Sequence, residues 1–123
     1  MRRVDLIARV EWCAVAVAAI VLYGLTGISW WLFALLILAP DLSMVGYLAG
    51  PRVGAAAYNA LHILAFPVAL AFCGIWFGHS PVTAVALVWI AHIAIDRMLG
   101  YGLKLPTDFR DTHLGRIGRD VSP

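Results

Sequence analysis

Residues 81–103 read PVTAVALVWIAHIAIDRMLGYGL, an apolar run interrupted near its end by His92, Asp96 and Arg97. A helix needs about 20 residues to cross the hydrocarbon core of a bilayer, since each residue adds about 1.5 Å. The run has that length, and Pro81 is well placed in the first turn of a helix. We therefore predict a transmembrane helix over 81–103.

Three further apolar runs approach the same length, at about 6–23, 29–48 and 53–77. Pro40 lacks a backbone N–H, so the second run is predicted to kink or break there. Short connections between the runs predict antiparallel neighbours. The expected fold class is all-α: a polytopic membrane protein whose four-transmembrane-helix antiparallel bundle makes up a single domain, residues 1–123, with a polar tail over 104–123.

The composition supports a membrane environment. Of the 123 residues, 63% are hydrophobic and 13% are charged, whereas a soluble domain is roughly 45–50% apolar and about 25% charged. A soluble fold of this size leaves much of its surface exposed and could not hide so many apolar side chains. The lipid bilayer is therefore the expected partner. The net charge of +2 is concentrated at the chain ends and in one connection, so we expect no nucleic-acid partner.

The basic residues all fall on one predicted side of the membrane. The two connections expected on the other side, 25–29 and 78–81, contain none of the nine Lys and Arg residues. The positive-inside rule then places both termini and the 49–52 connection in the cytoplasm. The beginning of the chain resembles a signal peptide, but Asp5 and Glu11 interrupt its positive region. We interpret it as part of an uncleaved first span.

Several polar side chains fall inside or beside these runs, where an ionisable group costs about 3 kcal/mol to insert. His92 and Asp96 lie four residues apart and share a helix face. Asn59 and His62, three apart, share a face as well. Counted along the helix rise, most of these groups lie in the predicted cytoplasmic half. The set consists of Glu11, Asp41, Asn59, His62, His92, Asp96 and Arg97.

Each of these residues has a structural explanation of its own. His92 and Asp96 could satisfy each other through a hydrogen bond. Asp41 could cap a helix after Pro40 or pair with an arginine, and Glu11 could form an ion pair at the membrane interface. All of them together in one short chain favour a functional cluster instead, because a purely structural bundle could use leucine at several of these positions.

The cluster has the ligand chemistry of a metal site. Imidazole and carboxylate suit zinc, manganese or iron, and the sequence predicts a divalent metal site whose candidate ligands are His62, His92, Asp96, Asp41 and His113. His113 belongs to the tail, which either folds back over the cluster or stays solvated. Asn59, Arg97 and Glu11 are expected to complete the polar cluster. A proton relay would use the same groups.

Other local patterns are less informative. Cys13 and Cys73 lie far apart in apolar runs, which excludes a zinc knuckle. The sequence contains no P-loop, GxSxG, HExxH or dinucleotide fingerprint. Gly46, Gly50 and Gly54, spaced four apart, predict either a tight turn between the second and third spans or a close helix contact.

Five motifs carry a family resemblance. The chain contains LAPDLSMVGY at 38–47, GPRVG at 50–54, YNALH at 58–62, AHIAIDRMLGYGLK at 91–104 and DTHLG at 111–115. As a set, over about residues 8–118, they resemble the domain-of-unknown-function family DUF4260 of small bacterial integral membrane proteins. The resemblance implies a multi-pass protein of the bacterial inner membrane and supplies no activity. Pro40-Asp41 and the His92/Asp96 pair also show a weaker likeness to small inner-membrane metal-dependent hydrolases.

Three classes of function fit these observations. The first is a non-catalytic membrane module whose cluster binds an ion, a proton or a partner, either a second copy of the chain or another membrane protein. The second is a membrane-embedded metal-dependent hydrolase acting on a lipid-linked substrate. The third is a haem protein with His62 and His92 as axial ligands, for which the sequence has no other haem signature. We favour the module over the enzyme, because a fold alone does not show that a protein catalyses a reaction.

Overall fold

The structure is a computed structural model that describes residues 2–106 and 110–117. Within these residues, four helical segments are long and apolar enough to cross a membrane: Arg3–Leu25, Trp30–Ala49, Pro51–Trp76 and Ser80–Leu99. This confirms the prediction of an all-α membrane bundle. The elements in chain order are α1 (Arg3–Leu25), α2 (Trp30–Leu36), the 3₁₀ helix η1 (Ala39–Ala49), α3 (Pro51–His62), α4 (Ala65–Trp76), α5 (Ser80–Leu99), β1 (Asp111–Thr112) and β2 (Gly115–Arg116).

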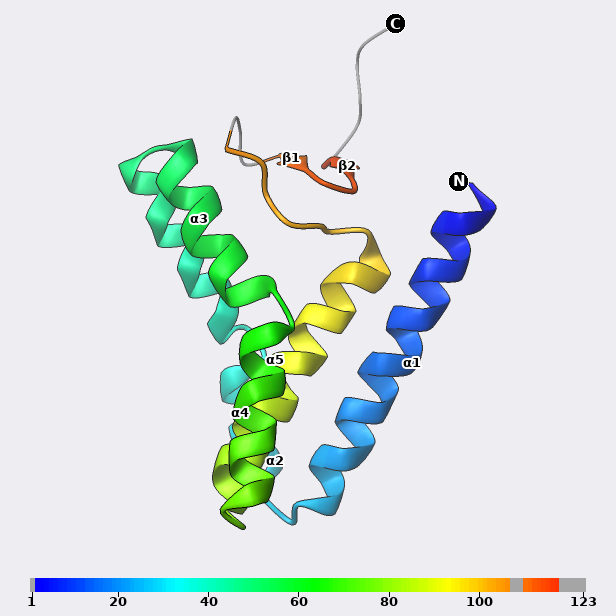
Figure 1. Cartoon of the computed structure of the whole chain (residues 1–123), viewed down its shortest axis with the longest axis vertical. Helices are drawn as coiled ribbons and strands as arrows, with labels where there is room; N and C mark the ends of the chain where they lie inside the picture. Colours follow the sequence, from blue (N-terminus) through cyan, green and yellow to red (C-terminus); the bar gives the residue numbers. More distant parts are fainter. Residues whose placement is uncertain (1, 107–109, 118–123) are drawn as a thin grey trace, which may run out of the picture.

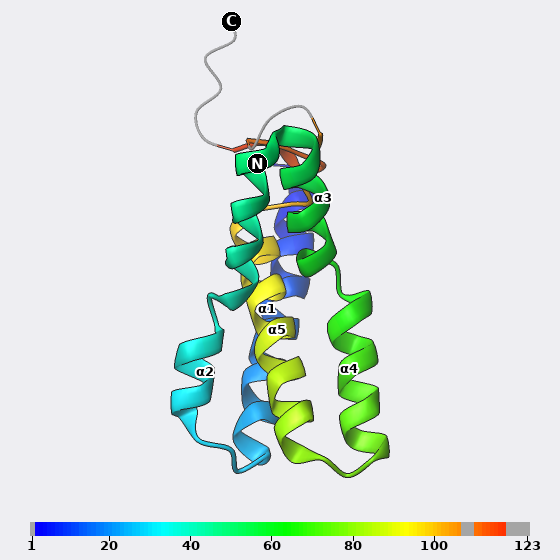
Figure 2. The ribbon, with the colours of Figure 1, turned by 90° about the vertical axis from the view of Figure 1, so that its left-hand side faces the viewer.

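The segments are arranged around α5, which is the most buried of them. In the most apolar 18 residues of α5, half of the residues are buried inside the protein, whereas 6–17% are buried in the corresponding stretches of the other three segments. In Figure 1, α5 runs between α1 on one side and the α3 and α4 pair on the other. The α1–α2 and α4–α5 turns lie at one end, whereas the start of α1, the η1–α3 turn and the β1–β2 hairpin lie at the other (Figures 1 and 2). The chain is a multi-pass membrane protein.

Large apolar side chains cover the outside of the bundle, as expected for a surface in contact with lipid. Leu48 is 90% exposed, Trp76 85% and Trp31 78%. Trp31 lies near the start of α2, and Trp76 is the last residue of α4. Both are therefore close to the end of the bundle that holds the α1–α2 and α4–α5 turns, which contain no lysine or arginine. This is where an aromatic belt at a membrane interface would lie.

The second span breaks at Pro40, as the sequence predicts. The α-helix ends at Leu36, and the chain continues as the 3₁₀ helix η1 from Ala39. The Asp41 N–H donates to the Leu38 carbonyl at 3.1 Å and therefore not to the Ile37 carbonyl, its partner in an unbroken α-helix. The break leaves the Ile37 carbonyl available for a side chain.

The third span, predicted over about 53–77, runs from Pro51 to Trp76 and breaks between α3 and α4. Ile63 has extended backbone angles, φ −99° and ψ 144°. The cause is Pro67, which lacks an N–H and whose ring collides with the carbonyl of the residue four positions earlier. That residue is Ile63. The break frees the last carbonyls of α3 and makes His62 its final residue.

The fourth helix is shorter than the predicted 81–103 and ends at Leu99. Gly100 adopts a left-handed conformation with φ 93°, which a glycine reaches at no steric cost. Its N–H donates to the Arg97 carbonyl at 3.1 Å, and the Tyr101 N–H donates to the Asp96 carbonyl at 2.8 Å. The chain then turns away from the helix axis toward the hairpin (Figure 1).

Both alternatives for the glycine repeat hold. Gly50, with φ 109°, makes the turn between η1 and α3. A Cβ added to Gly46 would lie 2.9 Å from the Ala57 Cβ, and one added to Gly54 would overlap the Tyr47 ring. The two glycines therefore let η1 and α3 approach closely as an antiparallel pair (Figure 2).

Candidate metal centre

Four side chains from three segments converge on one point inside the bundle. They are Asp41 from η1, His62 from the end of α3, and His92 and Asp96 from α5. One potential ligand atom of each lies within 4.8 Å of the ligand atoms of the other three. His62 is completely buried and His92 is 4% exposed. The candidate ligands that the sequence predicts within the spans therefore meet.

The five distances that involve an imidazole Nε2 are short and nearly equal. Asp41 Oδ1 lies 3.2 Å from His62 Nε2 and 3.1 Å from His92 Nε2. Asp96 Oδ2 lies 3.4 Å and 3.3 Å from the same two nitrogens. The two Nε2 atoms are 3.1 Å apart. The Nε2 atom of each imidazole thus faces both carboxylates and the Nε2 atom of the other imidazole.

Backbone carbonyls fix the tautomer of both histidines. His62 Nδ1 lies 2.7 Å from the Tyr58 carbonyl oxygen, and His92 Nδ1 lies 2.5 Å from that of Ile37. A carbonyl can only accept a hydrogen bond, so both Nδ1 atoms carry the hydrogen. Both Nε2 atoms then present a lone pair to the centre of the group. Histidines that bind a metal are commonly oriented in this way by their second nitrogen.

The centre of the group requires a positive charge. The two Nε2 lone pairs and the carboxylate oxygens are all acceptors, so their short contacts repel unless a cation lies among them. A proton on one imidazole is one such cation, and a metal ion is another. The Tyr58 hydroxyl donates toward Asp96 Oδ2 at 3.4 Å, at the edge of the group. The Tyr58 ring also stacks on His62, with ring centroids 3.7 Å apart.

Side chains of α5 satisfy the free carbonyls at the end of α3. The Trp89 indole N–H donates to the Leu61 carbonyl at 2.7 Å, and Arg97 Nη2 donates to the His62 carbonyl at 2.8 Å. The last carbonyls of a helix have no partner within it, and a buried unpaired carbonyl is costly. These two bonds therefore anchor the backbone of His62 to α5. Arg97 therefore lies against the neighbouring helix α3.

The chain after α5 folds against α3. The Asn59 side chain pairs with the backbone of Lys104 in both directions, accepting from its N–H at 2.6 Å and donating to its carbonyl at 2.8 Å. Lys104 Nζ lies 4.8 Å from the centroid of the Tyr58 ring. Burial lowers the pKa of the Lys104 ammonium, and the negative charges of Asp96 and Asp41 partly oppose this shift.

Two candidates from the sequence lie outside the group. His113 is in the turn between β1 and β2, where its Nδ1 accepts the Leu103 N–H at 2.7 Å. The tail thus folds back over the bundle without bringing His113 to the other candidate ligands. Glu11 is exposed on α1. Tyr58 is not among the residues predicted from the sequence, although its position four residues before His62 places both on one helix face.

Comparison with known proteins identifies the family. Residues 5–117 match the family model described as "Domain of unknown function (DUF4260)". No match was found among curated proteins or among solved structures. The matched residues extend from the first turn of α1 through β2 and include the four converging side chains. With nearly its whole length matched, the chain belongs to the DUF4260 family.

Proposed function

We propose that this chain is a metal-binding membrane module that holds one divalent ion between Asp41, His62, His92 and Asp96. The observation that carries the proposal is the set of distances among the four ligand atoms. A tetrahedral site with metal–ligand bonds of about 2.0–2.1 Å has edges of about 3.3–3.4 Å, because the edge is about 1.63 times the bond. The five edges that involve a histidine nitrogen are 3.1–3.4 Å, and the edge between the two carboxylates lies within 4.8 Å, so binding of an ion would draw Asp41 and Asp96 together.

Zinc is the ion that fits this ligand set best. It accepts imidazole nitrogen and carboxylate oxygen, and it is almost always tetrahedral in structural sites. Manganese and iron accept the same ligands, but octahedral surroundings suit manganese and open coordination positions suit iron. A divalent ion would also neutralise the two carboxylates, which are costly to bury in a membrane without compensation.

The ion would connect three segments of the fold. Asp41 lies on η1, His62 on α3, and the remaining two ligands on α5. A bound ion would therefore fix the η1–α3 pair against the central helix. Four protein ligands leave no open position, which is the pattern of a structural site. We place the protein in the bacterial inner membrane, with the end that carries Arg52 in the cytoplasm.

Elemental analysis of protein purified in detergent from zinc-replete cells tests this proposal. We expect about one zinc per chain in the wild type, since a site of this kind retains its ion through purification. The His113→Ala and Glu11→Gln variants are expected to keep the ion, because neither residue lies among the four ligands. A metal-free wild type from replete cells would contradict the proposal, and loss of zinc from His113→Ala would contradict the ligand set.

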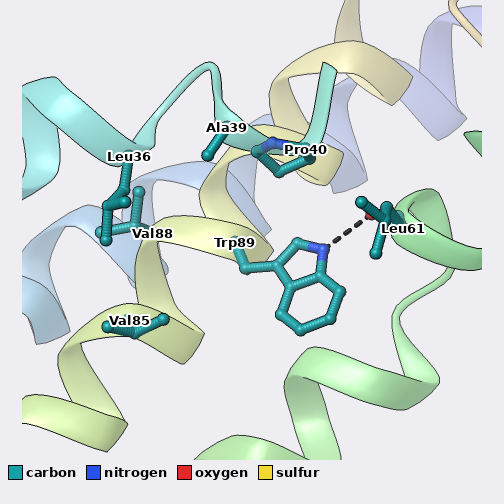
Figure 3. Close-up of a pocket in the computed structure, with 7 residues that line it drawn as sticks. All are labelled: Leu36, Ala39, Pro40, Leu61, Val85, Val88 and Trp89. Carbon is teal, nitrogen blue, oxygen red and sulfur yellow. Dashed lines mark hydrogen bonds between the residues drawn. The ribbon is translucent and has the colours of Figure 1, made fainter. Parts of the chain in front are cut away.

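A second candidate function is hydrolysis of a lipid-linked ester at the same metal. An apolar cavity of about 200 Å³ favours it. Figure 3 shows the lining, in which Pro40 and Leu61 are the residues immediately before Asp41 and His62. The indole of Trp89, which lines the cavity, donates its N–H to the Leu61 carbonyl (Figure 3). An apolar chain held here would lie beside the metal centre.

Asp41 would be the mobile ligand in such a reaction. Its side chain is 32% exposed, against 16% for Asp96. Release of Asp41 would open a position for water, whose pKa zinc lowers toward about 7. The water oxygen would bond to the ester carbonyl carbon, the bond to the alcohol oxygen would break, and that oxygen would take the proton. The products are a carboxylic acid and an alcohol.

A variant that fills the cavity tests whether the protein is a hydrolase or only the metal-binding module. In zinc-loaded protein, Val85→Trp is expected to raise the KM for a long-chain ester about tenfold or more and to leave the KM for a short-chain ester unchanged. Val21→Trp, at an exposed position, is the matched control. Ester hydrolysis by purified protein is measured for both substrates. No hydrolysis by the zinc-loaded wild type rules out the enzyme and leaves the module standing.

A further inference from the structure

A second cavity, separate from the proposed metal centre, lies at the end of the bundle where α1 begins and α5 ends. It has a volume of about 440 Å³ and lies between the first turns of α1, the end of α5 and the β1–β2 turn. Pockets for small ligands usually measure about 300–1,000 Å³. Its polar lining consists of Arg2, Asp5, Arg9, Trp12, Arg97 and His113.

The charges that line this cavity are predominantly positive. Asp5 accepts two hydrogen bonds from Arg2, both of 3.0 Å, so these two charges balance each other. Among the residues that the structure describes, Arg9 and Arg97 form no ion pair. Two guanidinium groups therefore face one cavity without a matching carboxylate, which leaves it suited to an anion.

Each of the two arginines is held in place. Arg97 is 7% exposed. It donates to the carbonyls of His62 and Tyr101, both at 2.8 Å, which orients the guanidinium but does not neutralise it. Arg9 is half-buried against Gly100, where a Cβ would lie 2.5 Å from its Nη2. The missing side chain at Gly100 gives Arg9 the room to enter the cavity.

His113 adds a neutral donor at the rim. Its Nδ1 accepts the Leu103 N–H, so the neutral ring carries its hydrogen on Nε2. Burial and the nearby Arg97 charge lower the pKa of His113, which keeps the ring neutral at pH 7. The rim thus combines a hydrogen-bond donor with two cations, and guanidinium groups suit phosphate because they donate in pairs.

We propose that this cavity binds the phosphate group of an anionic phospholipid headgroup. The depth of the cavity argues for a lipid over a soluble phosphate. Arg9 and Trp12 lie two to three turns into the membrane-spanning α1, on the cavity side of that helix. Tryptophan is favoured where acyl chains meet headgroups. A phospholipid places its phosphate at this level while its acyl chains cover the exposed apolar face of α1.

The test uses the full-length protein in a mild detergent with zinc bound. Native mass spectrometry measures the binding of phosphatidylglycerol to the wild type and to Arg9→Gln, Arg9→Lys and Arg3→Gln. Arg3→Gln is the matched control, since it removes the same charge from the same helix outside the cavity. We expect about tenfold weaker binding in Arg9→Gln, intermediate binding in Arg9→Lys and little change in Arg3→Gln.

The outcomes separate this site from surface charge and from the metal centre. If Arg9→Gln and Arg3→Gln weaken phosphatidylglycerol binding equally, the lipid is attracted only by the general positive charge of the surface. That result would overturn the proposal. Displacement of phosphatidylglycerol by inorganic phosphate alone would overturn the choice of a lipid. The zinc content of Arg9→Gln is expected to equal that of the wild type, which shows that the variant is folded. Failure of the lipid site therefore leaves the metal centre untouched.

Discussion

Replacing His92 by alanine is expected to weaken zinc binding by more than about 100-fold, since loss of a residue that only orients a ligand already costs about 10–100-fold. His92 Nε2 lies within 3.1–3.3 Å of both carboxylates and of His62 Nε2. The variant would leave three candidate ligands, Asp41, His62 and Asp96. Competition with a chromogenic chelator, using detergent-purified protein, measures the change in dissociation constant.

The control for this variant is His79→Ala. His79 is exposed and lies at the other end of the bundle, before α5, so its loss is expected to leave zinc affinity within about twofold. His62→Ala should match His92→Ala, because the two imidazoles occupy equivalent places in the group. Unchanged affinity in both variants would remove these histidines from the ligand set.

Removing the metal is expected to destabilise the protein substantially. A ligand that binds only the folded state at 100 times its dissociation constant adds about 2.7 kcal/mol to the free energy of unfolding. The site joins η1, α3 and α5, which lie far apart in an unfolded chain, so the unfolded state holds the ion poorly. Thermal unfolding in detergent, with and without a chelator, measures this contribution.

A double variant shows whether the group acts through a metal or as polar packing. His92→Leu with Asp96→Leu removes two ligands from one face of α5 and replaces them with apolar side chains. Its melting temperature should not respond to zinc or to the chelator. The wild type should respond to both. A wild type that is equally insensitive would mean that the four side chains are bound to one another through protons only.

Local spacing predicts only part of this centre. His92 and Asp96 are four residues apart on one helix, so a regular α-helix is enough to place them together. The length of the four apolar runs likewise determines the number of spans, because a bilayer has a fixed thickness. These features depend on the chain within about one helix and can be derived without any knowledge of packing.

The contributions of Asp41 and His62 depend on two helix breaks. Pro40 was recognised as a break, but a proline alone does not show that the next residue will turn toward α5. Pro67 lies within a long apolar run, and its effect falls four residues earlier, at Ile63. The sequence therefore predicts the right residue types and the third span, but not the break that positions His62. His113 was harder to place, since the tail has no periodic pattern.

The breaks and the candidate site are structurally coupled. Each break frees backbone carbonyls inside the membrane, where such groups need partners. The Ile37 carbonyl accepts from His92, the Leu61 carbonyl from Trp89 and the His62 carbonyl from Arg97. All three donors belong to α5. The central helix thus satisfies both breaks while it supplies two of the four candidate ligand atoms.

X-ray absorption spectroscopy at the zinc edge of the purified protein tests the proposed centre most directly. We expect one zinc environment with four nitrogen and oxygen neighbours at about 2.0–2.1 Å and with the scattering pattern of two imidazole rings. His92→Ala should lose this signal, and His79→Ala should keep it. A sulfur neighbour at about 2.3 Å, or a spectrum without imidazole scattering, would contradict the account.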